Sequence, residues 1–335
     1  MAAVLFGAEN PEAMTRARQA YQYAQSGDLD RAAATMREAI QLAPSNPLFY
    51  SALGGILARQ NKPAEARQAF EQAVKLDPSN AVLRFNLAAK QAEAFQFEQA
   101  RENLLRVLEA QPDHPQAFAL LENVSLEFGA VLARGRRYKG GQTLARETVR
   151  RFPQSGPAHE MLGLFETRNQ ENVLAVEAYK RALELSPDSR GASIGLAIAQ
   201  SAAGLTDAAI ATFEAGIRRF PEDAMHRQSL GVLLVRLGET REDVRARGIQ
   251  LLESALRLDP RLPEAHYQLG NLALTRAAVD EAVEHLEQAV RNGEDSSRVH
   301  FALSRAYRRL GKPEKADAEL ALFRRRKAAE EKAAP

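Results

Sequence analysis

The chain has 335 residues, a formal net charge of +2 and no cysteine. The near-neutral charge argues against general nucleic-acid binding driven by phosphate neutralisation. The lack of cysteine excludes disulfides, thiolate metal sites and cysteine nucleophiles. No stretch approaches the roughly 18 apolar residues of a membrane span, and no linker or composition shift divides the chain, which favours one repetitive array.

The chain begins with a short apolar segment, residues 2–8, within a stub that ends at residue 12. The segment lacks a basic n-region and is short for the core of a signal peptide, so we expect a frayed N-terminus. The alternative is the remnant of a signal peptide. We therefore expect a cytoplasmic protein from the sequence as given, and a periplasmic or secreted one if residues 2–8 are such a remnant.

After this stub a proline recurs, mostly at steps of 34 residues. The marks are Pro44, Pro78, Pro112, Pro153, Pro187, Pro221 and Pro260, and Glu294 stands in the same context 34 residues later. Leucine occurs nine residues after every mark, a leucine column, and Ala or Gly occurs twelve residues before it. We expect the leucines, such as Leu162 and Leu196, to be buried at helix crossings. A residue that precedes proline is biased away from the helical region, so each proline is expected to separate one unit from the next.

Within one period the apolar residues follow helical spacing, as in Leu53, Ile56 and Leu57 and again in Ala66 and Phe70. Each unit is therefore expected to contain two helices, joined by a short turn into an antiparallel hairpin. Two helices are expected to meet at the recurrent Ala or Gly column, because small residues there would let them approach closely. A period of this length predicts stacked units, each burying its apolar face against its neighbours.

These columns resemble the tetratricopeptide repeat family. The residues that carry the resemblance in one period are Tyr50, Leu53, Gly54, Ala66, Phe70, Ala73 and Pro78. The resemblance covers residues 13–330, as nine repeats in one array, and leaves residues 331–335 as a polar tail. It implies an all-α, right-handed superhelical solenoid of antiparallel helix pairs. It also implies that the first helices line a concave groove, where such proteins usually bind extended or helical peptide segments.

Two repeats depart from the period. The step from Pro112 to Pro153 has seven extra residues, about two helical turns. We expect one long helix from near His114 to near Gly135, followed by a protruding tip at residues 136–139. The other departure is five extra residues between Gly238 and Gly248. Five residues are not a whole number of turns, so a longer loop is expected there, with capping-box-like spacing at residues 240 and 243.

The residues seven, eleven and fourteen positions after each mark are expected to face the groove. In the fifth to seventh repeats these positions are largely apolar, and in the eighth and ninth they are aromatic, amide or basic. The candidate partner-binding residues are Leu164, Ile194, Ile198, Val232, Val235, Tyr267, Asn271, Phe301, Arg305 and Arg308. Two other interpretations stay open: the apolar residues pack against neighbouring first helices, or the arginines belong to a solvated terminal helix.

No catalytic constellation emerges from the sequence, and we expect neither a metal nor a cofactor. His159, His266 and His300 occupy a column that is aromatic in other repeats, which indicates packing. Residues 191–195 read GASIG and formally match a nucleophile elbow, but a helical repeat surrounds them where a strand would be needed. The clamp with which some relatives bind acidic chaperone tails is absent as a set, because the groove-side asparagines lack consecutive basic partners.

The sequence therefore favours a non-enzymatic scaffold that binds a protein or peptide segment in its groove. A preformed groove would lose little freedom on binding. The first alternative is a structural protein that self-associates into a homo-oligomer through apolar helix faces at its N-terminal end. The second is an accessory subunit of an enzyme or of a secretion or envelope assembly.

Overall fold

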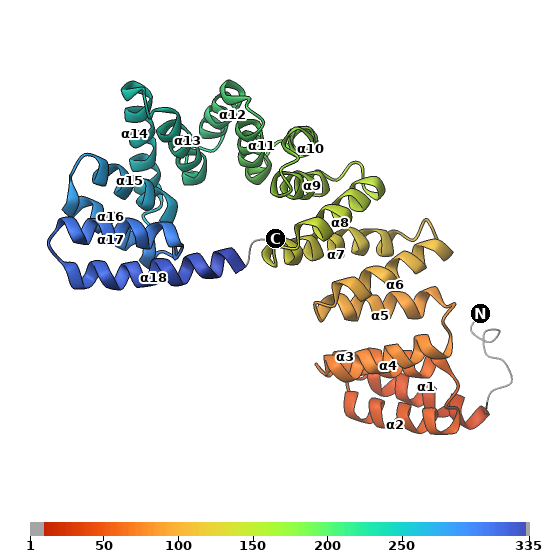
Figure 1. Ribbon diagram of the computed structural model, residues 1–335. Helices are drawn as coiled ribbons and strands as arrows, with labels where there is room; N and C mark the ends of the chain where they lie inside the picture. The colour runs from red at the N-terminus through yellow and green to blue at the C-terminus, as the bar shows by residue number, and fades with distance from the viewer. Residues whose placement is uncertain (1–9, 333–335) are drawn as a thin grey trace. The chain divides into compact units, whose positions relative to one another are not determined.

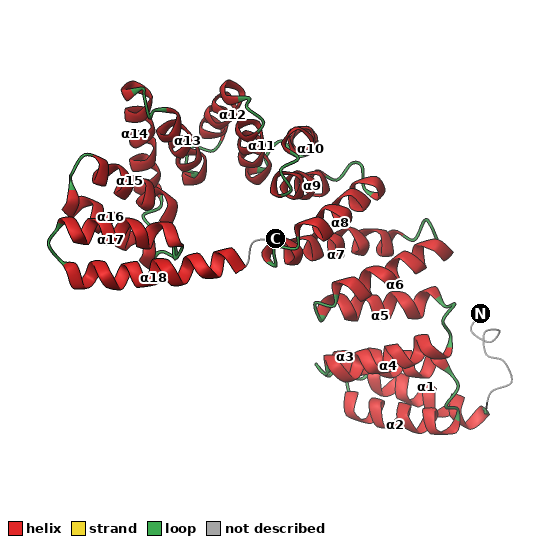
Figure 2. Ribbon diagram, in the orientation of Figure 1, coloured by secondary structure: helices red, strands yellow, loops and turns green. Residues whose placement is uncertain are grey.

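The computed structural model describes residues 10–332, and over that range it contains eighteen α-helices and no strand (Figure 2). The expectation of an all-α chain is confirmed. The expectation for residues 2–8 lies outside the described residues. Contacts along the chain divide it into two compact units, residues 1–165 and 166–335, and each unit is described by itself.

Unit 1 is a run of helix pairs in which consecutive helices pack against each other (Figure 1). Its helices are α1 (Pro11–Gln25), α2 (Leu29–Leu42), α3 (Pro47–Arg59), α4 (Pro63–Leu76), α5 (Ala81–Glu93), α6 (Phe97–Ala110), α7 (Pro115–Arg134) and α8 (Tyr138–Arg151). The next helix, α9 (Gly156–Arg168), contains the boundary between the units.

Unit 2 repeats the same arrangement of helix pairs. Its helices are α10 (Asn172–Leu185), α11 (Arg190–Ala202), α12 (Thr206–Arg219), α13 (Ala224–Leu237), α14 (Glu242–Leu258), α15 (Pro263–Thr275), α16 (Val279–Arg291), α17 (Ser297–Arg309) and α18 (Pro313–Lys332).

Many of these helices have an N-cap residue whose side chain accepts a hydrogen bond from the backbone of the first turn. Asn46 and Asn80 accept hydrogen bonds from the backbone N–H groups of the first turns of α3 and α5. Such caps satisfy donors that have no partner within the helix. The turn inside several pairs places one residue in the left-handed region, which glycine enters without strain, as Gly27 does at φ 86°. Short loops therefore suffice to join the two helices of a pair.

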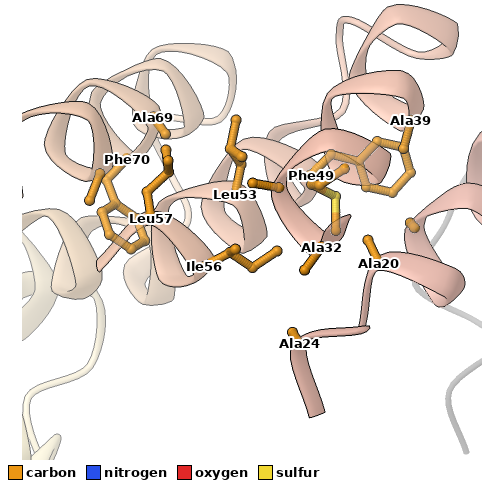
Figure 3. Packing of buried hydrophobic residues seen from close by; sticks show 14 of the residues in the cluster. Ala20, Ala24, Ala32, Ala39, Phe49, Leu53, Ile56, Leu57, Ala69 and Phe70 are labelled. Carbon is orange, nitrogen blue, oxygen red and sulfur yellow. The ribbon is translucent and has the colours of Figure 1, made fainter. Parts of the chain in front are cut away.

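The recurrent small residues lie at crossings of two helices, as predicted. Ala32 and Ala66 are completely buried, and the close-up of this core shows Ala32 near the labelled side chains of Phe49 and Ile56 (Figure 3). Gly141 occupies the same column in α8, where an added Cβ would lie 2.0 Å from the ring of Phe165. At Ala32 and Gly141 the small residue leaves room for larger side chains of the first helix of the next pair, α3 or α9.

The leucine column is buried in seven of its eight positions. The buried members are Leu53, Leu87, Leu121, Leu196, Leu230, Leu269 and Leu303. Leu162 is only half-buried, so the prediction of a buried crossing residue is wrong there. The neighbouring Met161 and Phe165 fill that core instead, and Met161 reaches so close to Gly129 that an added Cβ would lie 2.1 Å from its sulfur.

The longer fourth repeat has the expected long first helix. Helix α7 spans 20 residues and ends at the C-cap Gly135, because two added turns keep its buried face in phase. The predicted protruding tip is wrong, since α8 begins at Tyr138 and the Tyr138 side chain packs against the core around Leu132. Only residues 135–137 separate α7 from α8, with Arg136 at φ 54°.

The five extra residues after Gly238 do not form the longer loop that the spacing predicted. Three of them lengthen α14 to 17 residues, compared with 14 in α12. One more lengthens α13 to 14 residues, compared with 13 in α11, and the linker between the two helices gains only one residue. The backbone at Gly238 lies so close to α14 that an added Cβ would be 2.5 Å from the nitrogen of Arg245, so the chain turns tightly and the helix starts early. The expected capping box is also absent, because the N-cap is Arg241 and it makes no side-chain cap bond.

Candidate functional site

The first helices of successive pairs contact one another within unit 2. Helix α11 contacts α13, α13 contacts α15 and α15 contacts α17, and corresponding contacts do not recur between the second helices of these pairs over the described residues. The first helices therefore lie closer together than the second helices. Together they form one continuous surface of unit 2, which we call the inner face.

A hollow of about 350 Å³ opens on this inner face between α11 and α13, and we call it the apolar hollow. It is lined by Ile198, Ser201, Ala202, Phe213, Gln228, Ser229, Val232, Leu233, Arg236 and Glu264. The Ile198 side chain is 44% exposed, although it is a large apolar residue. Val232 is half-buried and packs at its edge against the core around Leu252.

Polar groups fix the walls of the apolar hollow. The guanidinium of Arg236 donates a hydrogen bond to Ser201 Oγ at 3.0 Å, which joins the ends of α13 and α11. Gln228 is buried, and its Oε1 accepts a hydrogen bond from the backbone nitrogen of Ala265 at 3.2 Å. These bonds hold three successive first helices in place, so the hollow is largely formed before any ligand enters.

The side chains of the other apolar candidates are less exposed to solvent. Ile194 is half-buried against the core around Phe213, and Val235 is half-buried against the core that contains Leu252. Leu164 is half-buried and lies in unit 1, so nothing groups it with the apolar hollow. Ile198 and Val232 are the two apolar candidates that share one hollow.

Tyr267 and Asn271 are half-buried on α15. The guanidinium of Arg298 lies 4.3 Å from the centre of the Tyr267 ring, a cation–π contact. Burial alone would lower the pKa of Arg298, but its hydrogen bonds to Glu294 and Glu264 outweigh that effect and raise the pKa. Arg298 is therefore a fixed cation that covers one face of Tyr267 and is already neutralised by carboxylates.

A second hollow of about 410 Å³ lies on α17, and we call it the basic hollow. It is lined by Phe301, Ser304, Arg305, Arg308, Arg309 and Leu320. Arg308 pairs with Asp317 at 3.3 Å, and Arg309 donates to the backbone oxygen of Leu274 at 2.6 Å. Arg305 lies 6.0 Å from the Phe301 ring and has no carboxylate partner among residues 10–332, which leaves its charge available.

Eight of the ten residues that line the apolar hollow are not among the candidates named from the sequence: Ser201, Ala202, Phe213, Gln228, Ser229, Leu233, Arg236 and Glu264. Ser201 and Gln228 lie at expected groove-facing positions, fourteen residues after Pro187 and seven residues after Pro221. Ala202, Ser229, Leu233 and Arg236 each directly follow such a position, and Glu264 lies one helical turn before Tyr267. A wider stripe of each first helix would include these seven residues, whereas Phe213 belongs to the second helix α12.

Three histidines make polar contacts that an aromatic packing residue could not make. His159 and His266 each place Nε2 near the backbone oxygen of a preceding proline, at 3.1 and 3.0 Å. His300 is buried between two carboxylates, with Nδ1 2.7 Å from Glu319 and Nε2 2.9 Å from Asp295. These two contacts hold the His300 ring between the loop before α17 and helix α18.

The contacts of His300 help to hold the last helix. The hydrogen bond from His300 lowers the pKa of Asp295, and Arg326 on α18 adds to the effect. Within the described range, no group of three or more His, Asp or Glu side chains is arranged to hold a metal ion. None of the helices between residues 10 and 332 is long and apolar enough to cross a membrane.

Comparison with known families gives matches along most of the chain. One model described as tetratricopeptide repeat matches residues 57–124, 168–231 and 245–300. A second model with the same description matches residues 16–81 and 126–190. These ranges fall in both units, and on the inner face they include α11 and α15 and the first residues of α13 and α17.

Two relatives are similar over part of the sequence. The chain is 29% identical over 195 residues to the human protein O-mannosyl-transferase TMTC3, which is 58% of this chain and 21% of that protein. It is 35% identical over 81 residues to the peroxisomal targeting signal receptor of Saccharomyces cerevisiae, which is 24% of this chain and 13% of that protein. The chain thus spans about a fifth or less of the length of either relative.

Solved structures of similar fold include two helical repeat proteins. One is YrrB, described as a tetratricopeptide repeat protein with an unusual peptide-binding site, at 21% identity and a TM-score of 0.45, covering 59% of this chain and 96% of that one. The other is the Cut9–Hcn1 assembly of the APC/C, at 15% identity and a TM-score of 0.49, covering 91% of this chain and 79% of the other.

Proposed function

The chain belongs to the tetratricopeptide repeat family, and from this premise we propose that it binds a peptide segment of a partner protein along the inner face of unit 2. The observation that carries the proposal is the apolar hollow, where the large side chain of Ile198 stays 44% exposed next to Val232. Exposed apolar surface rimmed by polar groups often marks a protein-binding site. The binding role itself requires no catalytic residue.

The charges on the inner face suggest how the segment would be oriented. Arg236 borders the apolar hollow, and Arg305 lies in the basic hollow three first helices away from Ile198. Apolar side chains of the peptide would occupy the apolar hollow, while acidic side chains would lie toward Arg305 and Arg308. Hydrophobic contact would supply most of the affinity, and the exposed charges would mainly set orientation.

The experiment uses a library of random dodecapeptides displayed on phage, selected on the full chain. Selected peptides are then synthesised and their affinities measured by calorimetry. The double variant Ile198→Asp with Val232→Asp places two charges in the apolar contact, where an unpaired buried charge is expensive. We expect a loss of about 100-fold or more in affinity, which corresponds to roughly 3 kcal/mol.

The matched control is the double variant Val173→Asp with Leu205→Asp. Both residues are exposed and apolar in unit 2, but they lie at the start of second helices and neither lines the apolar hollow. This control should bind the selected peptides like the parent. If no peptide is enriched, or if both double variants bind equally well, the inner face is not the site and self-association becomes the better hypothesis.

A separate variant tests the orientation. Replacing Arg305 and Arg308 by Ala should weaken the binding of acidic peptides mainly at low salt, because exposed charges are screened beyond about 10 Å at 0.1 M ionic strength. Calorimetry at low and at high salt measures this difference. An equal effect at both salt concentrations would contradict the assigned role of these two arginines.

A further inference from the structure

We propose that Ser193, His226 and Asp223 form a reactive serine site in unit 2 that accepts acyl groups from small esters. Ser193 lies on α11, Asp223 is the N-cap of α13 and His226 lies in the first turn of α13. The site is distinct from the apolar hollow, and it does not rest on the proposed peptide binding.

The hydrogen bonds run in the direction that activates a serine. His226 Nδ1 lies 2.5 Å from Asp223 Oδ2, and His226 Nε2 lies 3.1 Å from Ser193 Oγ. A carboxylate only accepts, so Nδ1 carries the proton that faces Asp223. In the neutral ring Nε2 is then an acceptor, and the hydroxyl of Ser193 donates to it. A histidine oriented in this way by a carboxylate is a general base for a serine nucleophile.

The fold holds this histidine in one position. Asp223 Oδ2 also accepts the backbone N–H of His226 at 3.1 Å, so the cap of α13 fixes both residues. Gly216 on α12 provides the space for the imidazole, because an added Cβ would lie 2.1 Å from the ring. Phe220 stacks on the ring with centroids 5.6 Å apart. His226 is completely buried and its ring has little freedom to turn.

Ser193 is the member of the site that reaches open space. It lines a hollow of about 720 Å³ together with Leu183, Pro187, Ala211, Thr212, Ala215, Gly216, Arg218, Arg219 and Phe220. His226 and Asp223 do not line this hollow, which matches a nucleophile backed by a buried base. Ser193 also belongs to the GASIG sequence, although it lies within a helix and not on a strand-to-helix turn.

The lining of this hollow suggests the class of substrate. Carbon atoms of Leu183, Pro187 and Phe220 would surround a short acyl chain, whereas Arg218 and Arg219 supply positive charge. Asp188 holds the guanidinium of Arg219 at 2.6 Å, and Arg218 has no ion-pair partner in the described part of the chain. Guanidinium groups favour negative charge that develops on a carbonyl oxygen or is carried by the leaving group. Small esters with an anionic group fit these features.

The reaction needs no reagent other than the ester and water. Ser193 Oγ bonds to the carbonyl carbon while its proton passes to His226 Nε2. The bond between that carbon and the ester oxygen then breaks, and the proton passes from Nε2 to the leaving alcohol. Water attacks the acyl-serine in the same way, giving its proton to Nε2, and the acid is released as the proton returns to Ser193 Oγ.

The test uses the full chain and a fluorophosphonate probe, which reacts covalently with activated serines. Peptide mass spectrometry should locate one label on Ser193, and p-nitrophenyl acetate should give a burst of nitrophenol. Ser193→Ala should abolish both signals. Ser125→Ala removes another buried serine, one within α7 of unit 1, and should leave both signals unchanged.

A second variant separates a reactive site from a merely structural helix cap. Asp223→Asn keeps a side chain that caps helices well, so α13 should remain folded, and circular dichroism checks this. It removes the carboxylate that sets the tautomer of His226, so labelling should slow by about 100-fold or more. Labelling of folded Asp223→Asn at the parent rate, or a folded parent that takes no label on Ser193, overturns the proposal.

Discussion

Gly140 and Gly141 are adjacent in helix α8 and differ in what an added methyl group would meet. Nothing lies within 4 Å of a Cβ at Gly140, whereas a Cβ at Gly141 would be 2.0 Å from the buried Phe165 ring. Gly140→Ala should therefore raise the free energy of unfolding by roughly 0.5 to 1 kcal/mol, because Ala loses less backbone freedom in a helix. Gly141→Ala should lower it by roughly 1 to 3 kcal/mol through overpacking.

Urea denaturation of the two single variants measures this difference directly. The two variants control for position in the helix, since both substitutions add one methyl group to the same turn of α8. Equal effects of the two substitutions would mean that the close approach of α8 to Phe165 relaxes without loss. A glycine in this column would then not be required by the packing of α8 against α9.

At the scale of elements, the contact between α15 and α16 should respond to mild acid. His266 Nδ1 lies 3.0 Å from His285 Nδ1, a distance that suits one donor and one acceptor but not two charged rings. Burial lowers the pKa of His285, and the neighbouring His266 lowers it further, while Glu281 and Glu284 act in the opposite direction and Arg276 adds to the lowering.

The sign of the pH effect follows from this shift. Below the ordinary histidine pKa of 6.5 the unfolded chain binds a proton that the folded chain takes up less readily, so unit 2 loses stability as the pH falls. We expect a lower denaturation midpoint at pH 5 than at pH 7, measured in urea. His285→Gln should reduce that difference. An unchanged pH dependence in this variant would show that other groups govern the acid response.

The sequence predicted the helix pairs well, because a 34-residue period and helical spacing report on contacts between neighbours. It also predicted the long helix α7, since seven residues are about two turns and keep the buried face in phase. It failed at α14, where the added residues extend the helix. The tight approach of Gly238 to Arg245 decides that outcome, and no periodic pattern reveals such a contact in advance.

The sequence predicted which helix face would carry the candidate site, but not which residues of that face are exposed. The spacing rule selected Ile198 and Val232, which share one hollow, but also Ile194 and Val235, which pack against neighbouring cores. Exposure differs among these residues because it depends on how closely adjacent first helices approach. The contact of Ser193 with His226 joins residues 33 positions apart. Its partners are identifiable only once the stacking of two pairs is known.

At the scale of the whole chain, stacked pairs should respond locally to the loss of a core residue. Leu196 is buried within α11, in the core that also contains Val176 and Tyr179. Leu196→Ala removes apolar atoms and leaves a cavity, which should lower stability by about 2 to 5 kcal/mol. Each unit of a repeat array contacts only its neighbours, so the damage should stay near the substituted helix.

Amide hydrogen exchange followed by mass spectrometry tests this expectation helix by helix. Protection should fall in α10 to α13 and remain unchanged in α1 to α6, because local opening follows local contacts. Ile198→Ala is the matched control, since it truncates an exposed apolar residue of the same helix and should leave protection intact. If Leu196→Ala lowers protection equally in all helices, the described chain unfolds as one cooperative body, and the nearest-neighbour account of its stability is wrong.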